Sequence, residues 1–263
     1  MTLEKRSSFA ITKAVIFALI LREMRSRFGR KRFGVFWVFF EPAVQIAFIM
    51  MIFSFRNVTV RNGIEFPPFL VSGMIPFFLM RNMALQSMSA VDANRALFAY
   101  KQIKPLDPMI ARAIIETIIS AVVFCIFLFI LGFFFDYEIT MVDPIKWLAV
   151  LFIGLFFSFS LGLILCMVVD VVPELKTVIR IIFLPVYLLS GVLYPIWIMP
   201  NEVMNWLLWN PYLHIVDELR LAMFPHYPVH YGVNLEYPIK VAVMTSLLAF
   251  GLYRIRRTKL VAI

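Results

Sequence analysis

Apolar stretches long enough to cross a bilayer recur along this chain, and no other feature limits its fold so strongly. As a helix, about twenty apolar residues span the ~30 Å hydrocarbon layer. Inside lipid every backbone amide needs a partner within its own segment, which a helix provides. The 263 residues are 62% hydrophobic and 16% charged, whereas soluble proteins have roughly 45–50% apolar and about 25% charged residues. The sequence therefore predicts an all-α integral membrane protein with one membrane domain.

Charged loops and proline breaks divide the apolar sequence into six predicted transmembrane helices within residues 33–253. The expected spans lie near Phe33–Phe55, Phe66–Ser89, Met109–Phe135, Pro144–Val169, a proline-broken stretch from Val178, and Tyr237–Tyr253. Residues 201–224 are apolar but interrupted by Asn210, Pro211 and charged residues. Broken backbone at membrane depth is tolerated only against protein or water. This region is therefore predicted to be a re-entrant segment between helices five and six.

Residues 1–32 are predicted to form a cytoplasmic N-terminus with an interfacial amphipathic helix. A short apolar stretch there is surrounded by basic residues, which suits a helix lying in the headgroup region. Its basic side chains are expected to face water and lipid phosphate: Lys13, Arg22, Arg25 and Arg27. Residues 254–263 are predicted to form a basic cytoplasmic tail.

The net charge of +9 invites a nucleic-acid interpretation, but the distribution of the basic residues argues against it. Nine of the 25 Lys and Arg lie in residues 1–32 and four lie in residues 254–263, and each group flanks an apolar span. This arrangement follows the positive-inside rule and favours anionic lipid. It predicts a multi-pass membrane protein with both termini in the cytoplasm and no nucleic-acid partner.

Three ionisable residues fall inside the predicted spans, where charge is costly and often functional. Glu41, Arg81 and Glu116 each lie about seven or eight residues from the inner end of a span, so all three sit ~10–12 Å from the inner surface. This shared depth permits an ion-pair cluster in which Arg81 bridges Glu41, Glu116 or both. The alternative is that Arg81 meets a phosphate or a sugar acid of a transported molecule.

Aromatic residues crowd the first and fifth predicted spans and are candidates for a substrate path. They are Phe36, Trp37 and Phe40, with Tyr187, Tyr194 and Trp197. Aromatic faces suit the apolar faces of sugar rings without demanding one sugar sequence. Trp and Tyr near span ends are also ordinary interface anchors, and Phe ordinarily faces lipid or core. The pattern alone leaves both interpretations open.

The sequence contains no recognisable catalytic set. No glycine is followed by Lys, Ser or Thr, as a phosphate-binding loop requires. His226 and His230 flank Pro228, which disfavours a helical ligand pair, and Cys125 and Cys166 fall in apolar spans as small hydrophobes. We therefore expect a transport subunit without enzymatic activity and without a bound cofactor or metal.

Four segments carry a resemblance to a known family. LREMRSRFGRKRFGVFWVFFEP (residues 21–42) joins a basic helix to a span, and DVVPELKTVIR (170–180) is a short loop before a broken span. SGVLYPIWIMP (190–200) and WNPYLHIVDELR (209–220) follow in order. Together they resemble the membrane subunits of type-two ABC exporters, in particular bacterial capsular-polysaccharide permeases of the KpsM kind. The resemblance covers nearly the whole chain.

The resemblance implies partners and a cargo. Such permeases form homodimers in the bacterial inner membrane and engage two copies of a separate cytoplasmic subunit, which binds ATP and Mg. The cargo implied is a lipid-linked polysaccharide, and a periplasmic export adaptor is a further candidate partner. Lateral access of the lipid end is expected near the basic run of the chain and Arg81; the run consists of Arg30, Lys31 and Arg32.

The loop over residues 90–108 matches the position of the family's cytoplasmic coupling element. A short helix there is expected to present an apolar knob to a groove on the ATP-binding subunit, ringed by charge. The residues concerned are Asp92, Arg95, Leu97, Phe98, Tyr100, Lys101 and Lys104. A solvated loop held to lipid headgroups is the alternative.

Other functions compete with capsule export. The same architecture could export O-antigen, teichoic acid or a small drug. An ion-coupled secondary transporter is a different class, which predicts acids near the membrane midplane and paired repeats. The acids here are expected toward the inner side and no repeat is evident, so the exporter is favoured.

Overall fold

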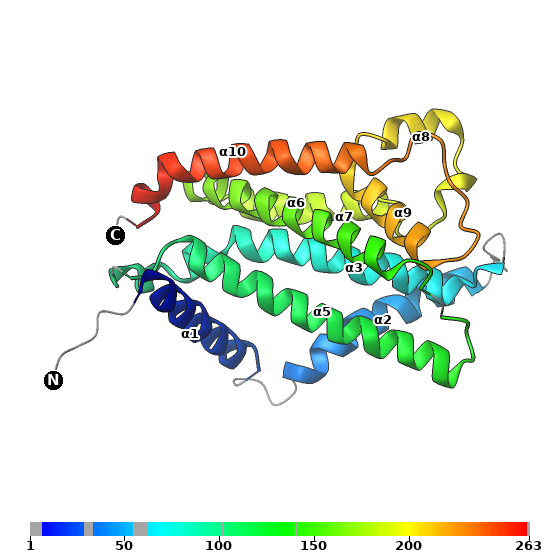
Figure 1. The fold of residues 1–263 in the computed structure, drawn as a ribbon, viewed down its shortest axis with the longest axis horizontal. Coiled ribbons are helices and arrows are strands. Elements are labelled where there is room, and N and C mark those ends of the chain that lie inside the picture. Colours follow the sequence, from blue (N-terminus) through cyan, green and yellow to red (C-terminus); the bar gives the residue numbers. More distant parts are fainter. Residues whose placement is uncertain (1–6, 29–33, 55–62, 101, 140, 262–263) are drawn as a thin grey trace.

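The computed structural model describes residues 7–28, 34–54, 63–100, 102–139 and 141–261, and over these residues the regular structure is helical (Figure 1). The longer helices are α1 (Ser8–Phe28), α2 (Gly34–Ser54), α3 (Phe66–Met88), α5 (Leu106–Phe134), α6 (Pro144–Val171), α7 (Leu175–Leu188), α9 (Pro211–Met223) and α10 (Glu236–Val261). Shorter pieces connect them: α4 (Ala90–Ala93), η2 (Arg95–Ala99), η3 (Ile196–Ile198) and α8 (Asn201–Leu207). The all-α prediction is confirmed.

Four of the described helices are long and apolar enough to cross a membrane, namely α3, α5, α6 and α10. Their bounds lie close to those expected from the sequence, because apolar length and flanking prolines are local properties. In α2 the described apolar stretch is Phe40–Ile52. At 14 residues, α7 reaches only ~21 Å and is shorter than the ~30 Å hydrocarbon layer. The chain is a multi-pass membrane protein.

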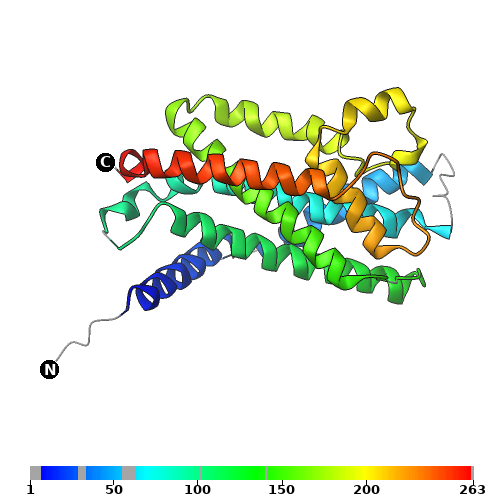
Figure 2. The same ribbon diagram turned by 45° about the horizontal axis from the view of Figure 1, so that its top comes forward.

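Helix α3 is the centre of the bundle, with α5, α6 and α9 packed around it and α10 beside α6 (Figures 1 and 2). The apolar window of α3 is 83% buried, against 28% for α5 and 22% for α10. Phe69, Leu70, Phe77 and Met80 have no exposed surface. Such a helix, apolar on nearly all sides, is stable only when neighbours surround it.

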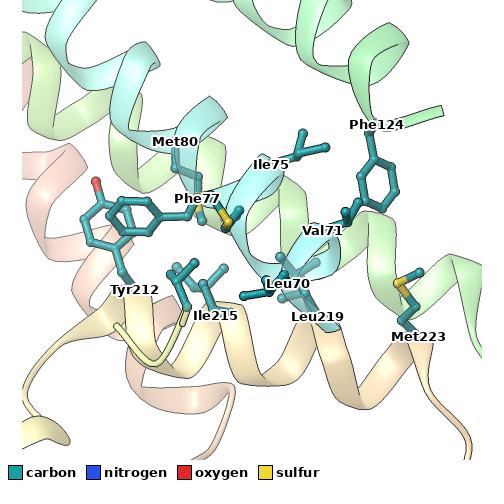
Figure 3. Packing of buried hydrophobic residues seen from close by; sticks show 14 of the residues in the cluster. Leu70, Val71, Ile75, Phe77, Met80, Phe124, Tyr212, Ile215, Leu219 and Met223 are labelled. Atoms are coloured by element: carbon teal, nitrogen blue, oxygen red, sulfur yellow. The ribbon is translucent and has the colours of Figure 1, made fainter. Parts of the chain in front are cut away.

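Helix α9 is short but lies in the core. Asn210 caps it by accepting a hydrogen bond from the backbone nitrogen of Tyr212 at 3.0 Å, and Pro211 occupies its first turn. Figure 3 shows one face of α9 turned toward α3, with Tyr212, Ile215 and Leu219 meeting side chains such as Phe77. The predicted break at the Asn-Pro pair is confirmed, since α8 ends before it.

One end of the bundle, which we call the basic end, holds α4, η2, the α6–α7 turn and the last turns of α10 (left in Figure 1). The opposite end, holding α8, is the α8 end. The basic residues expected to form a separate tail from 254 instead continue α10 to Val261. Lys and Arg are good helix formers and are favoured near a helix C-terminus, so they extend the helix.

Candidate functional site

A polar cavity of about 230 Å³ lies between α1, α2, α3 and α5, within the part of the chain that the structure describes. Its polar lining comes from the side chains of Arg27, Glu41, Gln45, Arg81, Asn82 and Glu116. The structure thus brings the three ionisable residues predicted inside the spans to one cavity. It adds Arg27, which the sequence had placed toward water.

The pairing inside this cavity differs from the predicted one. Arg27 Nη1 contacts Glu116 Oε1 at 2.6 Å, and among the described residues neither Glu41 nor Glu116 comes within 4 Å of the Arg81 guanidinium. The predicted bridge from Arg81 is therefore corrected. The reason is tertiary: α1 packs along α5, which brings a cation from outside the predicted spans to Glu116.

Helix α1 is held to the bundle by further polar contacts. Glu23 accepts a hydrogen bond from Arg27 Nε at 3.5 Å and forms an ion pair with Arg112 of α5, whose Nε lies 3.3 Å away. Arg22 Nη1 donates to Asn94 Oδ1 at 2.7 Å. Arg22 and Arg27 thus bind protein groups rather than pointing only at water and phosphate. Since these contacts are partly buried, salt screens them less than it screens surface pairs.

Arg81 is held by neutral groups. Its Nε and Nη2 donate to Asn82 Oδ1 at 3.3 and 3.2 Å, and its guanidinium lies 4.6 Å from the centroid of the Phe78 ring. A guanidinium stacked on an aromatic ring keeps donors free in its plane. Arg81 therefore lines the cavity with its guanidinium held by Asn82 and Phe78.

A second arginine, Arg220 on α9, has no exposed surface. It donates from Nη1 to the Gly191 oxygen at 2.6 Å, and from Nη2 to the oxygens of Val192 at 2.7 Å and Phe69 at 3.3 Å. Its guanidinium lies 3.6 Å from the centroid of the Phe69 ring. A Cβ at Gly73 would collide with this guanidinium, so only glycine fits there. Arg220 fastens the loop after α7 to α3 and α9.

Tyr227, in the loop after α9, supports the same region. Its hydroxyl donates to Asp217 Oδ1 at 2.5 Å. Burial raises the pKa of Tyr227 well above its ordinary value, so the phenol keeps its proton and remains a donor. Tyr227 also packs edge-on against Trp197. The segment after α9 is thus fixed to the helix that precedes it.

The described members of the predicted coupling segment lie at the basic end, where ion pairs connect four parts of the chain. Asp170 at the end of α6 accepts from Arg95 at 3.2 Å and from Arg256 of α10 at 3.3 Å. Asp92 meets Lys176 of α7 at 3.5 Å. The segment of α4 and η2 is therefore linked to α6, α7 and α10.

The apolar knob expected in this segment is only partly present. Tyr100 is 66% exposed, and Leu97 is half-buried. Phe98 is 4% exposed and packs in a cluster with Met109 and Leu163, so its expected role as an exposed contact is wrong. In a helical turn successive side chains point in different directions, and η2 turns Phe98 inward. Lys101 lies outside the described residues.

The aromatic path residues divide into two groups. Phe36, Trp37 and Phe40 are exposed on α2 and contact one another through their rings. Tyr187, Tyr194 and Trp197 instead lie in the protein interior or its loops. The basic run at residues 30–32 lies outside the described residues.

Tyr187 is buried against the rings of Phe77 and Phe78. The Tyr194 hydroxyl donates to the Leu188 oxygen at 2.6 Å. Trp197 packs edge-on against Phe69. Within this single chain these side chains contribute to packing, whereas the α2 aromatics are exposed.

Sequence reasoning missed the roles of Arg27, Arg220 and Asp170. The i, i+3 spacing of Asp217 and Arg220 was a usable signal, because two charges on one face of an apolar helix require buried partners. No comparable signal identifies Arg27 as the partner of Glu116, since the two lie far apart in sequence.

Comparisons with known proteins identify the family of this chain. The family model described as ABC-2 type transporter matches residues 14–224. The chain is 34% identical over 254 residues to "Polysialic acid transport protein KpsM" of Escherichia coli, which covers 95% of this chain and 96% of that protein.

Two further relatives are more distant. "Capsule polysaccharide export inner-membrane protein BexB" of Haemophilus influenzae is 27% identical over 83% of this chain and 82% of its own length. "Capsule polysaccharide export inner-membrane protein CtrC" of Neisseria meningitidis serogroup B is 25% identical over 82% of each chain. The family match covers most of the sequence, from α1 to the end of α9. This chain belongs to the ABC-2 type transporter family.

Proposed function

We propose that this chain is the permease subunit of an ABC exporter that moves a lipid-linked capsular polysaccharide across the bacterial inner membrane. The observation that carries the proposal is the 34% identity to a polysialic acid transport protein over 95% of the chain. Two capsule export inner-membrane proteins align over more than four fifths of the chain. Alignment over nearly full length favours a shared cargo class as well as a shared fold.

The energy source is proposed to be a separate subunit. The sequence lacks a phosphate-binding loop, so ATP and Mg would be held by a cytoplasmic partner, two copies of which would serve a homodimer of this chain. The permease itself would then have no enzymatic activity. A periplasmic export adaptor is a further proposed partner.

The proposed topology has six crossings and both termini in the cytoplasm. Basic residues gather at the basic end, near α4 and the last turns of α10, which the positive-inside rule would place in the cytoplasm. The fifth crossing would combine α7 with α9, and residues 201–224 would be re-entrant from the α8 end. Support comes from Asn210, whose Nδ2 donates to Ser190 Oγ at 2.9 Å and so joins the α8–α9 junction to the end of α7.

Coupling to the motor is proposed to run through the segment of α4 and η2. The exposed side chains of Asp92, Arg95 and Tyr100 would contact the ATP-binding subunit. Movement of this segment would reach α6 and α10 through Asp170, because Arg95 and Arg256 both bind its carboxylate.

The polysaccharide is proposed to pass at the interface of the homodimer, along the exposed aromatic face of α2. Phe36, Trp37 and Phe40 present 39–56% of their surface and would meet sugar rings. The basic run at residues 30–32 would attract the anionic lipid end, and Arg81 would bind a phosphate group in the polar cavity that it lines.

Coexpression tests the proposal. The chain and its ATP-binding subunit would be expressed in an Escherichia coli strain that makes polysialic acid but lacks its own permease and ATP-binding subunit. Surface polysialic acid detected by antibody on intact cells would support capsule export. Restoration by the permease alone would overturn the proposed division of labour.

Cargo specificity is tested in the source organism. Deletion of the gene should leave capsular polysaccharide trapped inside the cell, measured by extraction after cell lysis. An unchanged surface capsule after deletion would overturn the proposed cargo.

A further inference from the structure

An apolar groove lies beside the polar cavity, along helices that line both. This groove has a volume of about 920 Å³ and is formed by α2, α3 and α5, the helices that also line the cavity. On α5 the cavity is lined by Ile119 and Val123, and the groove by Ile126 and Ile130 in the following turns. The two volumes therefore lie in successive turns of the same helices, and we call them together the crevice, which is polar toward the basic end and apolar toward the α8 end.

The groove is open toward the surroundings of the bundle. Met51 and Phe135 in its lining are each 60% exposed, and Ile126 is 37% exposed. Since α3 and α5 are long and apolar enough to cross a membrane, an open apolar groove along them faces acyl chains rather than water.

The charges in the cavity divide into a satisfied pair and two further groups of opposite sign. Arg27 and Glu116 contact each other at 2.6 Å. Arg81 and Glu41 line the same cavity, and no ion pair within 4 Å joins either of them to an opposite charge in the described ranges. A ligand that carries one anionic and one cationic group would match them.

The size of the cavity limits the ligand. At ~30 Å³ for a water-sized group, 230 Å³ holds about eight such groups. This is the size of a phosphate joined to a short amino alcohol, and it is too small for a chain of sugars. This volume fits the headgroup of a membrane phospholipid better than the glycan end of a cargo.

We propose that this crevice binds a zwitterionic aminophospholipid of the surrounding bilayer. Its phosphate accepts hydrogen bonds from Arg81, its ammonium group pairs with Glu41, and an acyl chain fills the groove between α2 and α5. The polar-to-apolar order of the crevice matches a lipid whose headgroup lies toward the basic end. By filling this space, the lipid would fix the position of α2 relative to α3.

Lipid retention measured by native mass spectrometry tests the site. The full-length chain is delipidated in detergent and offered dioleoyl phosphatidylethanolamine, phosphatidylglycerol, phosphatidylcholine or dioleoylglycerol at equal concentration. We expect phosphatidylethanolamine to be retained at least fivefold better than the others, because only it offers both a phosphate and a primary ammonium group.

Single substitutions test the contributions of Arg81 and Glu41 to lipid retention separately. Arg81→Gln should reduce phosphatidylethanolamine retention at least fivefold. Glu41→Gln should abolish the preference for phosphatidylethanolamine over phosphatidylglycerol. Arg180→Gln, which changes an exposed arginine of α7 away from the crevice, is the matched control and should leave retention unchanged.

A photoreactive lipid tests the position independently of the charges. Phosphatidylethanolamine with a diazirine in its acyl chain should label peptides containing Met50 of α2 and residues 126–130 of α5. Ala47→Phe, which fills the groove, should remove this label while the folded chain still elutes as a single species.

Three results would overturn the proposal. They are equal retention of dioleoylglycerol, a preference for phosphatidylglycerol in the unaltered chain, and labelling of peptides outside α2, α3 and α5. Displacement of the retained lipid by an equal concentration of purified cargo glycolipid would also overturn it, because the site would then belong to the cargo.

Discussion

The two faces of α3 differ in how closely their neighbours pack against them. One face meets α6 and α9 so closely that glycines are required, as at Gly162, where an added Cβ would lie 2.6 Å from the Ser87 Cβ. The other face meets α2 and α5 across a crevice that contains a cavity of about 230 Å³ and a groove of about 920 Å³. We call the first face the packed seam. The second face borders the crevice.

Each face holds one arginine, and the arginines differ in the same way. Arg220 in the packed seam donates to three backbone oxygens and has no exposed surface. Arg81 in the crevice donates to one neighbouring amide and lines an open cavity. A buried guanidinium saturated by carbonyls stabilises the fold, whereas one held by neutral groups beside a cavity is available to a ligand.

The largest expected difference in stability is between two single variants, Arg220→Met and Arg81→Met. Arg220→Met removes the donor from three buried carbonyls, at about 1 kcal/mol or more each, so the free energy of unfolding should fall by several kcal/mol. Arg81→Met should cost less, because it loses the stacking on Phe78, about 0.5–1 kcal/mol, and part-buried contacts with the adjacent Asn82 side chain. Chemical unfolding in detergent, followed by circular dichroism, measures both. Equal losses would show that the two faces do not differ as described.

A pair of glycine substitutions tests the packed seam itself. Gly162→Ala places a methyl group 2.8 Å from the Ala84 oxygen, and overpacking of this kind costs about 1–3 kcal/mol. At Gly251 of α10 an added Cβ meets nothing within 4 Å, so Gly251→Ala should stabilise the helix by about 0.5–1 kcal/mol. The same unfolding measurement should give shifts of opposite sign. Two shifts of the same sign would contradict the close packing of α3 against α6.

Tyr227→Phe tests how far the packed seam extends toward the α8 end. The substitution leaves the buried Asp217 carboxylate without its phenolic donor, which should cost about 1–2 kcal/mol. Tyr231→Phe removes a hydroxyl from a side chain that is 99% exposed, so it serves as the control and should have no effect. If the two variants have the same free energy of unfolding, the contact between Tyr227 and Asp217 does not stabilise the fold.

The smallest stability effect is expected at the basic end. Asp170→Asn weakens two partly exposed ion pairs, each worth about 0–1 kcal/mol. Export per ATP hydrolysed should nevertheless fall severalfold, because the segment of α4 and η2 loses its link to α10. Glu236→Gln, which breaks an exposed pair with Lys240 at the other end of α10, is the control. Export and ATPase rates measured together in proteoliposomes separate loss of coupling from loss of folding.

Much of the fold could be predicted from local sequence. The expected span at Phe66–Ser89 matches α3 at Phe66–Met88, because apolar length and the proline pair at its start are local signals. The break before Pro211 was also predictable, since Asn-Pro both ends and begins helices. The candidate site was predicted by depth, since Glu41, Arg81 and Glu116 do line one cavity.

The pairing within that site could not be predicted in the same way. Glu116 binds Arg27 because α1 packs along α5. The sequence positions of the two residues do not predict that contact. The inward turn of Phe98 is a similar case, because its direction is set by the cluster around Met109 and Leu163.

The sequence by itself determined that this chain is helical, crosses the membrane several times and carries few charges within its spans. These properties follow from hydrophobic length and from the cost of unpaired backbone in lipid. The tertiary structure alone decided which arginine donates to three buried carbonyls and which lines a cavity, because side chains far apart in sequence meet only after the helices pack. The two faces of α3 are the result: one is closed by contact with α6 and α9, and the other packs on α5 beside a polar cavity and an apolar groove.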